Sequence, residues 1–84
     1  MNHILILCRS VTQAQRGGML LSRSGITNRI FRSPAGLTER GCSYSIRITP
    51  EHLHHAMELL RRGGIQPVKV VAQGPDGYTE VSAP

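Results

Sequence analysis

The fold of this chain is decided by one stretch, Ser43-Tyr44-Ser45-Ile46-Arg47-Ile48-Thr49-Pro50-Glu51. Its first part alternates polar and apolar residues, and this period of two predicts a strand that buries Tyr44, Ile46 and Ile48 on one face. Its last three residues provide an N-cap, a first-turn proline and an acidic side chain at the positive end of a helix dipole. A strand therefore ends, and a helix begins, near Thr49.

The segments on either side of this stretch predict the remaining strands and one more helix. Residues 4–8 form a short apolar run, typical of a central strand that is buried on both faces. Ser10 can cap a first helix, in which Gly17 and Gly18 are weak helix formers but permit close approach to the sheet. Residues 27–32 predict the second strand and residues 68–72 the fourth. The second helix is expected to bury Leu53, Ala56, Met57 and Leu60.

This order of elements, β-α-β-β-α-β, indicates an α+β fold of the ferredoxin-like class. Right-handed crossovers close such a chain into a four-stranded antiparallel sheet with both helices on one face. The expected spatial order of the strands is fourth, first, third, second. We predict a single domain over residues 1–74, followed over residues 75–84 by a turn and a C-terminal tail with room for a short edge strand.

The composition restricts the class of protein and its partners. The formal net charge is +5, and nine of the ten basic residues are arginine. This balance favours an anionic partner, either nucleic acid or an acidic protein surface, although a solvated basic surface has the same composition. Two cysteines do not make a disulfide-rich secreted scaffold, and neither a signal peptide nor a membrane-spanning run is recognisable. The sequence therefore predicts a cytoplasmic protein with reduced thiols and no membrane association.

Cys42 is the strongest candidate for a chemically reactive residue. It ends the loop that begins at Ser33, it directly follows a glycine, and Arg40 stands two residues before it. A nearby cation favours the thiolate, which is the reactive form of a cysteine. The alternative is a loop cysteine without a role.

The predicted topology brings a second cysteine towards the same edge of the sheet. Cys8 ends the first strand, and Cys42 immediately precedes the third strand, its antiparallel neighbour. Cys8 is a candidate partner thiol, although a buried strand-end cysteine is the stronger interpretation of its apolar context. The N-terminus of the first helix, which favours anions, belongs to this edge. The residues expected to stabilise a thiolate or a bound anion are Arg9, Ser10, Arg40, Gly41 and Ser43.

The histidines do not form a recognised metal motif. His52, His54 and His55 fall outside the apolar stripe of the second helix and are expected to face water. The sequence contains no Cys-x-x-Cys or His-Glu-x-x-His spacing, no paired carboxylates, no Ser/His/Asp order and no cofactor fingerprint. We therefore predict no metal, no cofactor, and an accessory role rather than that of a stand-alone enzyme.

Three pieces of the sequence carry a resemblance to a known family. They are the opening strand Leu5-Ile6-Leu7-Cys8-Arg9-Ser10, the turn Ser24-Gly25-Ile26, and the proline-bearing loop from Pro34 to Cys42. Over about residues 4–71 the chain resembles small bacterial proteins of the selenium/sulfur carrier-like family. The resemblance implies that Cys42 carries a persulfide or selenopersulfide, which passes from a donor protein to an acceptor protein.

Two functions of other classes stay open. The first strand is apolar on both faces, which favours a second copy of the chain over the open face of the sheet, as in a dimeric regulatory or assembly module. RNA-binding domains of this fold need exposed aromatic side chains on their central strands. The one aromatic there, Tyr44, shares its face with Ile46 and Ile48, so RNA binding would be electrostatic and is the weaker alternative.

Overall fold

The computed structural model describes residues 3–34, 36 and 44–81. Its strands, its two α-helices and one short 3₁₀ turn follow each other in the order β1 (His3–Cys8), α1 (Val11–Arg23), β2 (Arg29–Arg32), β3 (Tyr44–Ile48), η1 (Pro50–His52), α2 (Leu53–Arg62), β4 (Lys69–Gly74) and β5 (Gly77–Glu80). Of the helices in these ranges, none has the length and apolar character needed to cross a bilayer.

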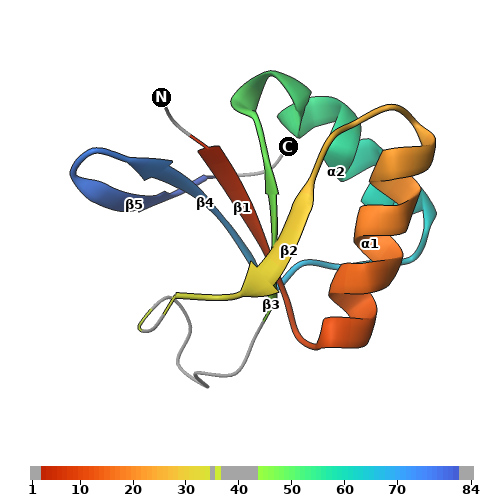
Figure 1. Ribbon diagram of the computed structural model, residues 1–84, viewed down its shortest axis with the longest axis horizontal. Helices are drawn as coiled ribbons and strands as arrows, with labels where there is room; N and C mark the ends of the chain where they lie inside the picture. The colour runs from red at the N-terminus through yellow and green to blue at the C-terminus, as the bar shows by residue number, and fades with distance from the viewer. Residues whose placement is uncertain (1–2, 35, 37–43, 82–84) are drawn as a thin grey trace.

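The strands form one antiparallel sheet in the order β2-β3-β1-β4-β5, and both α-helices lie on one of its faces (Figure 1). The predicted order of fourth, first, third and second strands is confirmed in β4, β1, β3 and β2. The prediction of four strands is wrong by one, because part of the expected tail forms β5. A turn at Pro75 and Asp76, followed by Gly77 at φ 118°, folds β5 back onto β4.

β2 begins at Arg29, two residues later than predicted, because the side chain of Asn28 is bound to α1. Its Nδ2 donates to the Gly18 carbonyl at 3.1 Å and to the Ser22 hydroxyl at 3.0 Å. These hydrogen bonds hold the end of the α1–β2 connection against the helix instead of in the sheet.

The helix-facing side of the sheet carries the main hydrophobic core. Ile6 of β1 and Ile46 of β3 are fully buried there. α1 approaches this layer closely because residue 17 is glycine: a Cβ atom on Gly17 would lie 2.8 Å from Ile46 Cδ1 and 3.0 Å from Leu60 Cδ2. The expected role of the paired glycines is therefore confirmed. The core also contains the predicted stripe of α2, Leu53, Ala56, Met57 and Leu60.

The opposite side of the sheet, here called the open face because no helix covers it, is buried at its centre as well. Leu5 and Leu7 of β1 are 0% exposed there and Val71 of β4 is 2% exposed, with Phe31 of β2 packed against them. Both faces of β1 are thus buried within a single chain, in agreement with its apolar sequence. These side chains do not require a second copy to cover them, which leaves the expected homodimer without this support.

Candidate functional site

The end of β1 meets the start of β3 at one edge of the sheet. Cys8 and Tyr44 are register partners across this pair, and Leu7 pairs with Lys69 at the start of β4. α1 begins at Val11, directly after Arg9 and Ser10. The predicted meeting of the end of the first strand, the start of the third and the N-terminus of the first helix is therefore confirmed.

Part of the predicted site cannot be placed in this arrangement. Arg40, Gly41, Cys42 and Ser43 lie outside the described residues, so their roles, and the expected proximity of Cys42 to Cys8, stay predictions. In the sequence a single residue, Ser43, separates Cys42 from Tyr44, the first residue of β3.

The Cys8 thiol lies inside the protein. The residue is 1% exposed and belongs to the helix-facing core, and its Sγ lies 3.8 Å from the Ile6 carbonyl oxygen, to which it donates a weak hydrogen bond. Burial raises the pKa of the Cys8 thiol to about 11, because an apolar environment disfavours the thiolate. Cys8 is therefore a neutral thiol at physiological pH, in agreement with the interpretation as a buried strand-end residue.

Arg9 and Ser10 occupy the start of α1 in two different ways. Ser10 has an extended backbone and its Oγ accepts a hydrogen bond of 3.2 Å from the Gln13 backbone N–H, so the predicted N-cap is confirmed. Arg9 is exposed, and the first turn of α1 contains no acidic residue. The guanidinium of Arg9 and the positive end of the helix dipole therefore lie at the same edge of the sheet as Cys8.

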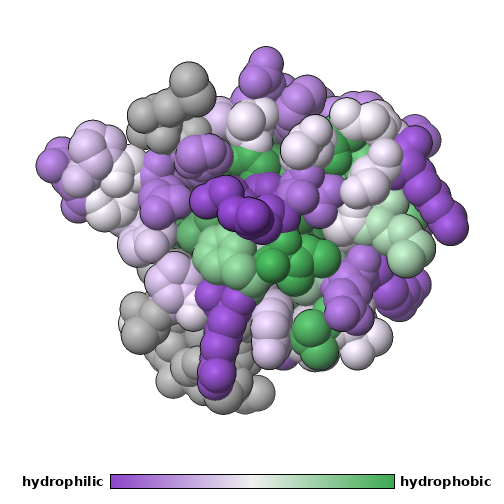
Figure 2. Space-filling view, in the orientation of Figure 1, coloured by the Kyte–Doolittle hydropathy of each residue, from purple (hydrophilic) through white to green (hydrophobic). Residues whose placement is uncertain are grey.

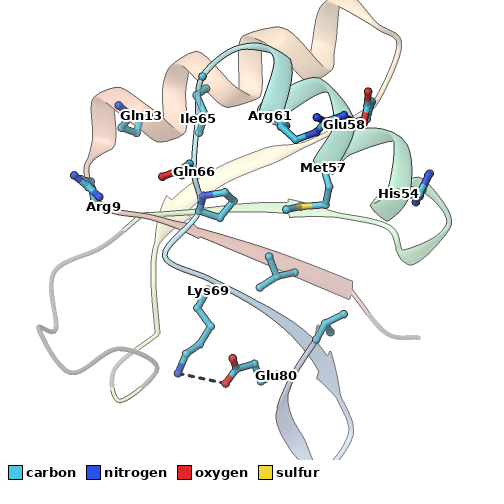
Figure 3. Close-up of a pocket in the computed structure, with 14 residues that line it drawn as sticks. Arg9, Gln13, His54, Met57, Glu58, Arg61, Ile65, Gln66, Lys69 and Glu80 are labelled. Carbon is cyan, nitrogen blue, oxygen red and sulfur yellow. Dashed lines mark hydrogen bonds and ion pairs between the residues drawn. The ribbon is translucent and has the colours of Figure 1, made fainter. Parts of the chain in front are cut away.

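A groove of about 890 Å³ opens beside this edge (Figure 3). It lies between α2, the connection from α2 to β4, and the end of β5, while Arg9 and Gln13 of the α1 start line one end of it. Its apolar lining consists of Met57, Ile65, Pro67, Val70 and Val81. The groove thus combines an apolar surface with polar side chains from three stretches of the sequence, residues 9–13, 54–70 and 80–81.

Most charges in the groove are paired. Arg61 Nη2 lies 2.6 Å from Glu58 Oε2, and Lys69 Nζ lies 4.0 Å from Glu80 Oε1 (Figure 3). The Arg61 guanidinium, hydrogen-bonded to Glu58, lowers the pKa of that carboxyl group. The salt bridges among the described residues do not include Arg9. Arg9 can therefore bind an anion without first breaking a salt bridge to a carboxylate of the described residues.

The sequence located the start of α1 but not the groove. Gln66 and Lys69 belong to no motif, and the pairing of Lys69 with Glu80 exists only because β5 folds back beside β4. Val81 reaches the groove through the same return of the chain, since its N–H donates to the Val70 carbonyl at 2.8 Å. The sequence allowed a short edge strand within residues 75–84, and placing that strand beside β4 could have indicated this side of the groove.

The prediction that the histidines face water is confirmed for two of the three. His54 and His55 are exposed on α2 and His52 is half-buried. Within the part of the chain that the structure describes, no three His, Cys, Asp or Glu side chains are grouped closely enough to hold a metal ion.

Comparison with known proteins identifies a family. A family model described as "Putative Se/S carrier protein-like" matches residues 3–72. No curated protein and no solved structure matches the chain significantly.

Proposed function

Because the chain belongs to the Se/S carrier protein-like family, we propose that it carries sulfur or selenium as a persulfide-type group on Cys42. The family match is the observation that carries this proposal, and the matched range, residues 3–72, includes both cysteines. The protein would then work with a donor and an acceptor protein, in a cytoplasm that keeps its thiols reduced.

The assignment to Cys42 is supported by the state of the other cysteine. A carrier thiol must be a thiolate and must be reached by a donor protein. Cys8 is 1% exposed with a raised pKa, so it satisfies neither condition in the folded chain. Cys8 could act as a partner thiol only after local opening of the core.

The chain connection supports a site at the β1–β3 edge. Two Cα–Cα steps join Cys42 to Tyr44, so the two Cα atoms are separated by at most about 7–8 Å. Tyr44 is the register partner of Cys8, which Arg9 follows directly. We propose that Arg9, Arg40 and the N-terminal dipole of α1 lower the pKa of the Cys42 thiol.

The transfer requires no oxidant beyond the donor. The Cys42 thiolate attacks the terminal sulfur of a donor persulfide, the donor S–S bond breaks, and the donor leaves as a thiolate. Cys42 now bears the persulfide. An acceptor nucleophile then attacks its terminal sulfur and releases the Cys42 thiolate. With a selenopersulfide donor, the same two displacements transfer selenium.

The experiment compares the two cysteines in one protein. Alkylation of the native chain is followed across pH by mass spectrometry, with Cys8 and Cys42 read separately, and a second, unalkylated sample is treated with glutathione persulfide. Cys42 is expected to be alkylated with an apparent pKa below the ~8.5 of a free thiol, and to gain the mass of one sulfur atom. Cys8→Ala should keep this gain and Cys42→Ser should lose it. A Cys42 that titrates as a free thiol and gains no sulfur contradicts the proposal.

A further inference from the structure

Two arginines face each other across β2 and β3 on the open face of the sheet. Arg29 and Arg47 are register partners, which places their Cβ atoms about 4.5–5.5 Å apart. Like charges in this position destabilise a sheet. A carboxylate within the chain or an anion from outside would offset this repulsion.

The described part of the chain does not provide that carboxylate. It contains no Asp or Glu up to Pro50. The described acidic residues after that point are Glu51, Glu58, Asp76 and Glu80. The salt bridges among the described residues pair Glu58 with Arg61 and Arg62 and pair Glu80 with Lys69, and they include neither Glu51 nor Asp76. Neither arginine of the β2–β3 pair takes part in a salt bridge among these residues.

The surroundings of the pair restrict what can bind. Arg47 is half-buried, and its guanidinium carbon lies 6.0 Å from the centre of the Phe31 ring. The ring has the Arg47 guanidinium beside it and packs against the apolar cluster of the open face, and both contacts compete with stacking of a nucleic-acid base on it. Arginine beside a half-buried aromatic and apolar residues is the composition of protein–protein interfaces. Figure 2 shows apolar surface over β2 between strongly hydrophilic residues.

From this geometry we infer that Arg29 and Arg47 bind a carboxylate of an acidic segment of a partner protein. The register pairing brings two guanidinium-bearing side chains to neighbouring positions on one face, and guanidinium N–H groups are the donors that bind the two oxygens of an aspartate or glutamate side chain most strongly. A bound carboxylate also removes the repulsion between the arginines. This surface includes neither cysteine, so the inference goes beyond sulfur or selenium transfer and does not depend on it.

The test measures binding of a short fluorescein-labelled polyglutamate peptide by anisotropy at physiological ionic strength. Replacing both arginines, Arg29→Gln with Arg47→Gln, is expected to weaken binding about tenfold or more. The matched control is Arg16→Gln with Arg23→Gln, because these are exposed arginines of α1 and the change in net charge is the same. This control should stay within about threefold of the wild type, and Cys42→Ser should bind like the wild type.

Three results would overturn the inference. The first is that the wild type does not bind the peptide, and the second is that the two double variants weaken binding equally. The third is that a single-stranded oligouridine of similar charge binds more tightly than the peptide through the same arginines. Thermal unfolding followed by circular dichroism shows that each variant is folded. If Arg29→Gln with Arg47→Gln does not fold, the single variant Arg29→Gln, at an exposed position, takes its place with the control Arg16→Gln.

Discussion

The two faces of the sheet are both buried at β1, but they are built by different means. On the helix-facing side, Gly17 lets α1 pack directly on apolar side chains of β3 and α2, and burial there keeps the Cys8 thiol neutral. On the open face the buried cluster is small, and it is bordered by the arginine pair and by Ser45, whose Oγ lies 2.7 Å from Ser33 Oγ. The comparison teaches that the helix-facing side supplies most of the stability, while the open face tolerates charge and polar groups.

The largest expected effect tests this division directly. Ile6 and Leu7 are consecutive in β1, both are 0% exposed, and they face opposite sides of the sheet. Truncating a buried Leu or Ile to Ala costs about 2–5 kcal/mol of unfolding free energy, depending on how well the site collapses. We expect Ile6→Ala near the upper end and Leu7→Ala near the lower end, measured by urea denaturation. If Leu7→Ala loses as much unfolding free energy as Ile6→Ala, or more, the helix-facing side does not supply most of the stability.

A second prediction concerns the close contact that only the helix-facing side possesses. Gly17→Val places branched carbons where Ile46 and Leu60 already stand, and overpacking of this kind costs about 1–3 kcal/mol. The loss should appear in urea denaturation even though valine is the better helix former. The control is Gln15→Val, an exposed position of the same helix. If both variants are as stable as the wild type, the close packing of α1 on the sheet does not require glycine at position 17.

A third prediction uses the exclusion of charge from the helix-facing core. Burial raises the Cys8 pKa to about 11 in the folded chain, well above that of a free thiol. Because the folded state keeps the proton longer, the stability from this group is complete below about pH 9 and is lost as the pH rises towards 11. The loss at pH 11 should be about 2 kcal/mol.

Because a change of pH acts on more than one group of the protein, the measured quantity is the difference in unfolding free energy between the wild type and Cys8→Ala. Urea denaturation at several pH values gives the unfolding free energies of both proteins. The difference should shrink in favour of the variant as the pH rises. A difference that does not change with pH would mean that the Cys8 thiol is more solvated than its 1% exposure indicates.

Most of the fold follows from local patterns in the sequence. The alternation in β3 and the apolar run of β1 gave the correct faces, because burial of one or both sides leaves a period that can be read without neighbours. β5 left no such signal, since all four of its residues are exposed. Its formation depends on the turn before Gly77 and on a free edge of β4.

The candidate site was predictable only where it depends on chain order. Arg9 and Ser10 were found because they follow a strand and precede a helix. The arginine pair was not predicted, because it depends on the register between β2 and β3. A shift of one residue in β2 would turn Arg29 to the other face of the sheet. Hydrophobic patterning specifies the strand's faces, but which charged residues become neighbours is decided by tertiary pairing.

The smallest expected effect sharpens the comparison at the arginine pair itself. Arg29→Glu places a carboxylate opposite Arg47, so a repulsive cross-strand pair becomes attractive, and the unfolding free energy should rise by about 0.2–1 kcal/mol. The control Arg16→Glu makes the same change in net charge on the exposed side of α1. Because the new carboxylate occupies Arg47, Arg29→Glu should also stop binding the polyglutamate peptide while becoming more stable. The unfolding free energies of both variants are measured by urea denaturation at low salt. Equal stabilisation by both variants would mean that the lower net charge is the cause, and that repulsion between Arg29 and Arg47 does not destabilise the sheet.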